Sequence, residues 1–73
     1  MEVAEKIRMY MDDNGITQAH ISRKTGIAMS KLSLALNGKR RFTFDEYESI
    51  CWALGVGVET FLEPRAPQGV EGR

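Results

Sequence analysis

The side chains that could do chemistry in this chain of 73 residues are mainly positive charges gathered in one stretch. No acidic residue stands between Asn14 and Phe44, and the basic residues there are Arg23, Lys24, Lys31, Lys39, Arg40 and Arg41. Although the formal net charge of the chain is zero, distant charges are screened beyond about 8 Å in physiological salt. The stretch therefore predicts a basic face that attracts phosphates. The alternative, a merely solvated run of charge, would usually interleave acids.

The residue types that catalyse reactions or bind metals form no recognisable group. Cys51 and His20 are the only residues of their kinds, so one chain cannot build a thiolate–imidazole zinc site or an internal disulfide. His20 has no carboxylate nearby in sequence to orient it as a general base. Glu46, Glu48 and Glu59 are too scattered for paired-carboxylate chemistry. We expect no enzyme, no metal and no cofactor.

Length and composition predict one small globular domain. A chain of this size buries roughly 60% of the surface of its unfolded state, so packing or dimerisation should matter. No apolar run approaches the roughly 18 residues of a membrane span, and the first residues lack the layout of a signal peptide. A single cysteine fits a reducing compartment. We expect a cytoplasmic domain over residues 1–63, followed by a disordered tail over 64–73.

Two short helices joined by a tight turn would position the basic residues. Thr17 is suited to cap a helix over 18–25, and Gly26 supplies the positive φ of a sharp turn. A second helix is predicted over 28–36, and Asn37-Gly38 would end it. Its buried stripe is expected to consist of Leu32, Ala35 and Leu36. This is the layout of a helix-turn-helix, which places its second helix in the major groove of DNA.

Three further helices complete the prediction. The first runs over 2–14, and a short last one runs over 56–62. The fourth begins at Thr43, which with Glu46 forms a capping box, and ends at Leu54. Its buried residues are expected to be Phe44, Tyr47, Ile50, Leu54 and either Cys51 or Ala53. Trp52 is expected to cover the end of the core; the alternative is a dimer contact.

The motifs that carry a family resemblance extend over Val3 to Leu62. They are Ile16-Thr17-Gln18, Gly26-Ile27, Leu32, Asn37-Gly38-Lys39 and Ala53-Leu54-Gly55-Val56. At this spacing they resemble the lambda-repressor-like, Cro-type (XRE-type) helix-turn-helix family. The resemblance implies a compact all-α five-helix domain, with the helix-turn-helix at helices 2 and 3. It also implies a sequence-specific transcriptional regulator of bacterial or phage repressor type that binds double-stranded DNA, usually as a homodimer on a two-fold operator.

The resemblance implies two sets of DNA-contacting residues. Those that face the bases are Gln18, Ala28, Met29, Ser30, Ser33 and Leu34. Those that contact phosphates are Thr17, Gln18, Arg23, Lys31, Asn37, Lys39, Arg40 and Arg41. The backbone amides after Asn37 would contact the same phosphate as its side chain. Lys31 would reach either a phosphate or a guanine.

Three departures from the family pattern bear on fold and function. Met11 and Leu36 stand where the family often pairs an arginine with a glutamate, and such a replacement of a buried ion pair is often neutral or stabilising. Ser22 replaces a small apolar residue, and its hydroxyl can bond back to the carbonyl four residues earlier. Residues 29–34 lack the amide and guanidinium groups whose bidentate base contacts are worth about 1–3 kcal/mol each. Much of the specificity should therefore come from DNA shape.

Two alternatives to a transcriptional regulator remain. The first is an antitoxin or controller protein of a small operon, which uses the same domain. The second is a protein-interaction module without strong DNA affinity, in which Met29 and Leu34 form an exposed apolar patch. We expect no membrane contact. We also expect no small-molecule ligand, because a chain of this length has no room for a separate sensing domain.

Overall fold

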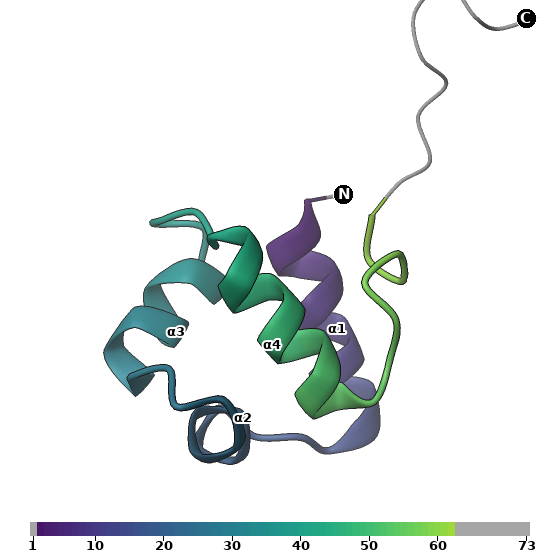
Figure 1. Cartoon of the computed structure of the whole chain (residues 1–73), viewed down its shortest axis with the longest axis horizontal. Helices are drawn as coiled ribbons and strands as arrows, with labels where there is room; N and C mark the ends of the chain where they lie inside the picture. The colour runs from purple at the N-terminus through teal and green to yellow at the C-terminus, as the bar shows by residue number, and fades with distance from the viewer. Residues whose placement is uncertain (1, 63–73) are drawn as a thin grey trace, which may run out of the picture.

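The computed structural model describes residues 2–62, which fold into four helices without strands. The helices are α1 (Val3–Asn14), α2 (Gln18–Thr25), α3 (Met29–Leu36) and α4 (Phe44–Leu54). In Figure 1, α4 lies in front of α1, and α2 and α3 lie to one side of that pair. The all-α prediction is confirmed, and the first four helices begin and end within one residue of the expected positions. The predicted tail over 64–73 lies outside the described residues.

The prediction of a fifth helix over 56–62 is wrong. This segment forms single turns, closed by hydrogen bonds from the Thr60 amide to the Gly57 carbonyl and from the Leu62 amide to the Glu59 carbonyl. Seven residues offer few bonds to offset the cost of helix nucleation, and a glycine lowers helix propensity by about 1 kcal/mol. The segment is held instead by Phe61, which is buried and meets the Tyr10 ring edge-on at 5.7 Å between centroids.

The core lies where the four helices meet. Its fully buried large side chains are Ile7, Ile21, Leu32, Leu36, Ile50 and Cys51. Met11 is also buried in this core, so Met11 and Leu36 are both apolar core residues. The Arg8 guanidinium caps the end of α3 by donating to the Leu36 carbonyl oxygen at 3.3 Å. No helix among the described residues is long and apolar enough to cross a membrane.

Two aromatic residues of α4 that were predicted to be buried lie on the surface. Phe44 is 62% exposed and Trp52 is 66% exposed. The buried stripe of this helix consists of Tyr47, Ile50, Cys51 and Leu54. Since successive residues of a helix are about 100° apart, position 52 lies far outside a stripe centred on these four, while position 44 lies at its edge, in the first turn of the helix. The Lys24 ammonium of α2 stacks over the Trp52 ring, 5.2 Å from its centroid.

Candidate nucleic-acid interface

The turn between α2 and α3 is fixed by two side-chain hydroxyls. Gly26 has a φ of 80°, a left-handed conformation that reverses the chain at little steric cost. The Thr25 hydroxyl donates to the Ile21 carbonyl at 2.8 Å and accepts from the Ile27 amide at 3.1 Å. The Ser22 hydroxyl donates to the Ile27 carbonyl at 2.7 Å. The prediction that the Ser22 hydroxyl bonds to a carbonyl of its own helix is therefore wrong. The turn brings the Ile27 carbonyl within reach of this hydroxyl instead.

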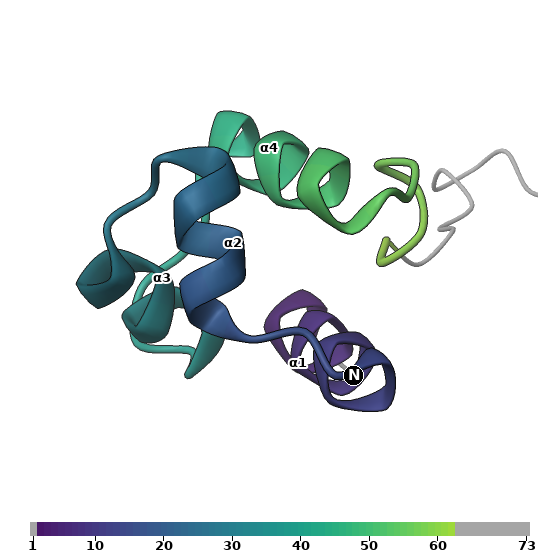
Figure 2. The same cartoon turned by 90° about the horizontal axis from the view of Figure 1, so that it is seen from below.

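The outward face of α3 carries the residues expected to face bases. With about 100° between successive residues, Ser30 and Leu34 fall opposite the buried stripe of the helix. Leu34 is 45% exposed and Met29 is 48% exposed, while Ser33 is half-buried. Ala28 is the exposed N-cap and offers no side-chain cap. Figure 2 shows α3 at one end of the molecule, with α2 between it and the other two helices.

A hollow of about 420 Å³ brings together the predicted phosphate contacts Thr17, Gln18 and Asn37. The Thr17 hydroxyl accepts from the His20 amide at 3.1 Å. The first amides of α2, which have no intrahelical acceptor, lie at the positive end of the helix dipole. The Asn37 side-chain amide donates to the Ser33 carbonyl at 2.9 Å and is thereby oriented. The helix N-terminus and the amides around the hollow attract an anion, whereas the carboxylate of Asp12, which also lines the hollow, opposes it.

The backbone amides that follow Asn37 are engaged within the protein. The Gly38 amide donates to the Ala35 carbonyl at 3.1 Å, and the Lys39 amide donates to the Leu34 carbonyl at 2.8 Å. This pair of bonds is the Schellman motif, with Gly38 in the left-handed conformation at a φ of 76°. The Gly38 and Lys39 amides therefore satisfy carbonyls at the end of α3, and a phosphate contact by the backbone after Asn37 stays a prediction.

Arg40, another predicted phosphate contact, is paired with Glu46 at the start of α4. Its Nη1 and Nη2 atoms lie 3.1 and 3.0 Å from the two carboxylate oxygens. The hydrogen bonds from Arg40 hold the pKa of the Glu46 carboxyl below its usual value, and a hydrogen bond from the Thr43 amide and the charge of Lys31 act in the same direction. Lys39 and Arg41 are exposed in the loop between α3 and α4.

The structure also places a residue at this interface that sequence reasoning missed. Arg8 of α1 lines the same hollow as Thr17, Gln18 and Asn37. No local signal marks it, because only the packing of α1 against the end of α3 brings it there. Arg23 is exposed in the last turn of α2, away from the hollow.

The buried titratable groups lie elsewhere, in the core. Burial raises the pKa of Tyr47 to about 12, and its hydroxyl donates to the Val58 carbonyl. Burial also raises the pKa of the Cys51 thiol, which keeps this group in its unreactive protonated form. Among the described residues, no group of three or more His, Cys, Asp or Glu side chains could hold a metal ion.

One comparison with known proteins gives a match. The model of a family described as "Cro/C1-type HTH DNA-binding domain" matches residues 6–67. The match includes α2, α3 and α4 entirely and α1 from its fourth residue onward. The comparisons with curated proteins and with solved structures found no match.

Proposed function

Because the chain belongs to the Cro/C1-type helix-turn-helix DNA-binding domain family, we propose that it is a sequence-specific transcriptional regulator that reads the major groove with residues 28–36. This is the family that the sequence motifs indicated, and its members bind DNA.

The observation that carries the proposal is the outward face of α3, which lies between two sets of residues predicted to contact phosphate. On one side lies the hollow lined by Thr17, Gln18 and Asn37, and on the other lie Lys31 and the Arg40–Glu46 pair. Contacts to phosphates on both sides would fix the register of the helix in the groove, and side chains between them would specify bases.

The base-reading surface is short of strong readout groups. Ser30 and Ser33 hydroxyls can donate to or accept from several base edges, while Leu34 and Met29 suit the methyl group of thymine. Neither kind of contact equals the bidentate pairing of an amide or a guanidinium. Phosphates should therefore supply most of the affinity, and DNA shape a large share of the specificity.

We propose further that the protein acts as a homodimer on a two-fold operator. Two copies would place their α3 helices about 34 Å apart, one turn of DNA. Repression would follow if the occupied operator overlaps a promoter.

A salt titration tests DNA binding directly. Binding of a short duplex of random sequence should weaken steeply as salt rises, with a slope of about 0.9 in log–log form for each phosphate neutralised. Arg41→Ala should lower the slope by about one unit for one lost contact. Absence of duplex binding at low salt would overturn the proposed function.

A protein-interaction module is the second candidate, and the exposure of Met29 and Leu34 favours it. Two apolar side chains half exposed on one short helix suit a protein partner as well as a thymine methyl. The salt titration separates these functions, because only the module predicts no affinity for duplex at low salt.

A further inference from the structure

The hollow beside the first turn of α2 is lined, among the described residues, by one basic and one acidic side chain. Its full lining consists of Arg8, Met11, Asp12, Ile16, Thr17, Gln18, Leu36 and Asn37. We call it the α2 hollow. The residues in it that are predicted to contact phosphate, Thr17, Gln18 and Asn37, are neutral. The charge of the α2 hollow is therefore decided by Arg8, by Asp12 and by the helix ends around it.

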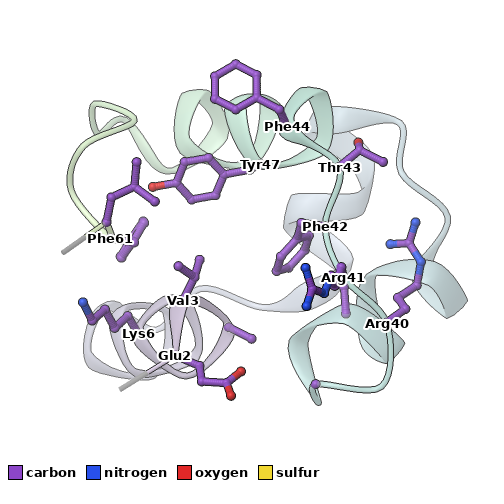
Figure 3. Close-up of a pocket in the computed structure, with 14 residues that line it drawn as sticks. Glu2, Val3, Lys6, Arg40, Arg41, Phe42, Thr43, Phe44, Tyr47 and Phe61 are labelled. Carbon is purple, nitrogen blue, oxygen red and sulfur yellow. The ribbon is translucent and has the colours of Figure 1, made fainter. Parts of the chain in front are cut away.

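The basic loop between α3 and α4 does not supply the α2 hollow with positive charge. Arg40 and Arg41 line a different and larger hollow of about 1000 Å³, between the first turns of α1 and α4 (Figure 3). Arg40 is also paired with Glu46, and Lys39 lines neither hollow. Within residues 2–62, the positive charge that an anion in the α2 hollow needs must therefore come from α1.

Without Arg8, the groups around the α2 hollow would carry a net negative charge. The aligned peptide dipoles place only about half a positive charge at the N-terminus of α2, which is less than the full negative charge of the Asp12 carboxylate. The end of α3 adds negative partial charge, since Leu36 lines the α2 hollow as well. Arg8 offsets both, because it binds the Leu36 carbonyl and adds a full positive charge against Asp12. The amides of α2 can then attract a phosphate.

Arg8 is oriented by α3 and keeps donors to spare. Its Nη1 atom donates to the Leu36 carbonyl at 3.3 Å, which is the only hydrogen bond of this exposed side chain within residues 2–62. A guanidinium holds several N–H donors in one rigid plane, so others remain for an anion. Asp12 lies one helical turn further along α1, yet among the same residues it forms no ion pair with Arg8. The guanidinium is thus held by the end of α3 and not by the carboxylate.

We propose that Arg8 is the cation that holds a DNA backbone phosphate in the α2 hollow, beside the first amides of α2. The family pattern does not supply this contact, because its frequent arginine stands at position 11, where this chain has the buried Met11. Since the same guanidinium binds the end of α3, the contact also fixes the position of α3 relative to the DNA backbone. This inference deepens the proposed function and rests on it.

Salt titration of duplex binding with two variants of Arg8 tests the assignment. Arg8→Gln should lower the log–log slope by about 0.9, the value for one phosphate neutralised, and should weaken binding at low salt. Arg8→Lys keeps the charge and should keep the slope, although it loses the planar fork. A residue that only held the end of α3 would lower the affinity in both variants and leave the slope unchanged. Circular dichroism checks that both variants are folded.

Asp12→Asn tests the charge balance in the opposite direction. Removal of this carboxylate from the α2 hollow should strengthen duplex binding, and in the Arg8→Gln background it should restore part of the lost affinity. Asp13→Asn is the matched control, because it removes the same charge from the next exposed position of α1, outside the α2 hollow. It should have a smaller effect in both backgrounds.

The outcomes separate this inference from the proposed function. If the wild type binds duplex and Arg8→Gln has the same salt slope, the assignment of Arg8 is overturned while DNA binding stands. Equal effects of Asp12→Asn and Asp13→Asn, or equal losses in Arg8→Gln and Arg8→Lys, also overturn it. A wild type that binds no duplex at low salt overturns both proposals, because the anion assigned to the α2 hollow is a phosphate of DNA.

Discussion

Arg40 and Glu46 form a two-pronged ion pair that ties the basic loop to the start of α4, with nitrogen–oxygen distances of 3.1 and 3.0 Å. The same carboxylate accepts from the Thr43 amide at 3.0 Å and completes the capping box of this helix. One acid therefore orients a basic side chain and caps a helix. Its negative charge also lies beside the side chains expected to meet phosphate, which leads to the first prediction.

Glu46→Gln should strengthen DNA binding. A glutamine can still accept from the Thr43 amide, so the capping box survives, while Arg40 loses its ionic partner and one negative charge leaves the interface. Affinity for a random duplex should rise, and the salt slope should increase by up to one unit if Arg40 reaches a phosphate. Glu48→Gln is the control, because it removes the same charge from an exposed position on the same helix. Equal effects of both variants would show that Arg40 is a structural residue.

Ser22→Ala should destabilise the turn of the helix-turn-helix. The hydroxyl donates to the Ile27 carbonyl at 2.7 Å in a half-buried position, and a buried carbonyl left without a donor costs about 1–3 kcal/mol. The midpoint of thermal unfolding should fall by about 4–8 °C for each kcal/mol in a domain of this size. Ser49→Ala is the matched control. Ser49 is equally half-buried on α4, and its hydroxyl makes no hydrogen bond within residues 2–62.

A different result would change the view of the turn. If Ser22→Ala and Ser49→Ala have the same midpoint of thermal unfolding, the hydrogen bonds of Thr25 to Ile21 and Ile27 are sufficient to hold the turn. A small apolar residue would then serve equally at position 22, as the family pattern suggests.

Alkaline pH should destabilise the fold through Tyr47. Its pKa is raised from 10 to about 12 in the folded protein, so the folded state holds the phenol proton more tightly than the unfolded state. This contribution is fully present below pH 10 and is lost as pH rises from about 10 to 12. The Cys51 thiol, whose pKa is also raised by burial, acts with the same sign from about pH 9.

Urea unfolding at a series of pH values measures this loss. The wild type should lose stability across the alkaline range, and Tyr47→Phe should lose less between pH 10 and 12, because phenylalanine has no proton to release. The variant should be less stable at neutral pH, where it lacks the bond to the Val58 carbonyl. Parallel declines in both proteins would assign the alkaline loss to other groups.

Local signals predicted the helix boundaries well. Thr17 and Thr43 accept from amides three residues later, as capping residues do, and Gly26 takes the positive φ that its turn requires. Each of these features depends only on residues close in sequence, so the chain alone reveals it.

Features that depend on the rotation and packing of whole helices were not predictable. Trp52 and Phe44 are apolar and were expected in the core, but the orientation of α4 turns them outward. Arg8 reaches the Leu36 carbonyl only because α1 packs across the end of α3. The engagement of Arg40 by Glu46 likewise follows from the path of the loop. The positive charge of the stretch between Asn14 and Phe44 was therefore predictable. Which of its basic side chains form ion pairs within the protein was not.

Ser30→Ala and Leu34→Ala should each change the sequence preference of the protein. Both positions lie opposite the buried stripe of α3, on the face that the proposed function assigns to base edges. In a selection of bound duplexes from a random pool, the wild type should yield a two-fold symmetric site. Ser30→Ala should relax preference at one pair of symmetric positions, and Leu34→Ala should reduce preference for thymine at another. Each wrong base pair typically costs about 1–3 kcal/mol, so the changes should be measurable.

The matched control for this selection is Glu48→Gln, an exposed substitution on α4 that lies outside both sets of predicted DNA contacts. It should leave the selected site unchanged. If Ser30→Ala and Leu34→Ala also leave it unchanged while binding persists, the outward face of α3 does not read bases. Specificity would then depend on how easily each sequence adopts the shape that the phosphate contacts require.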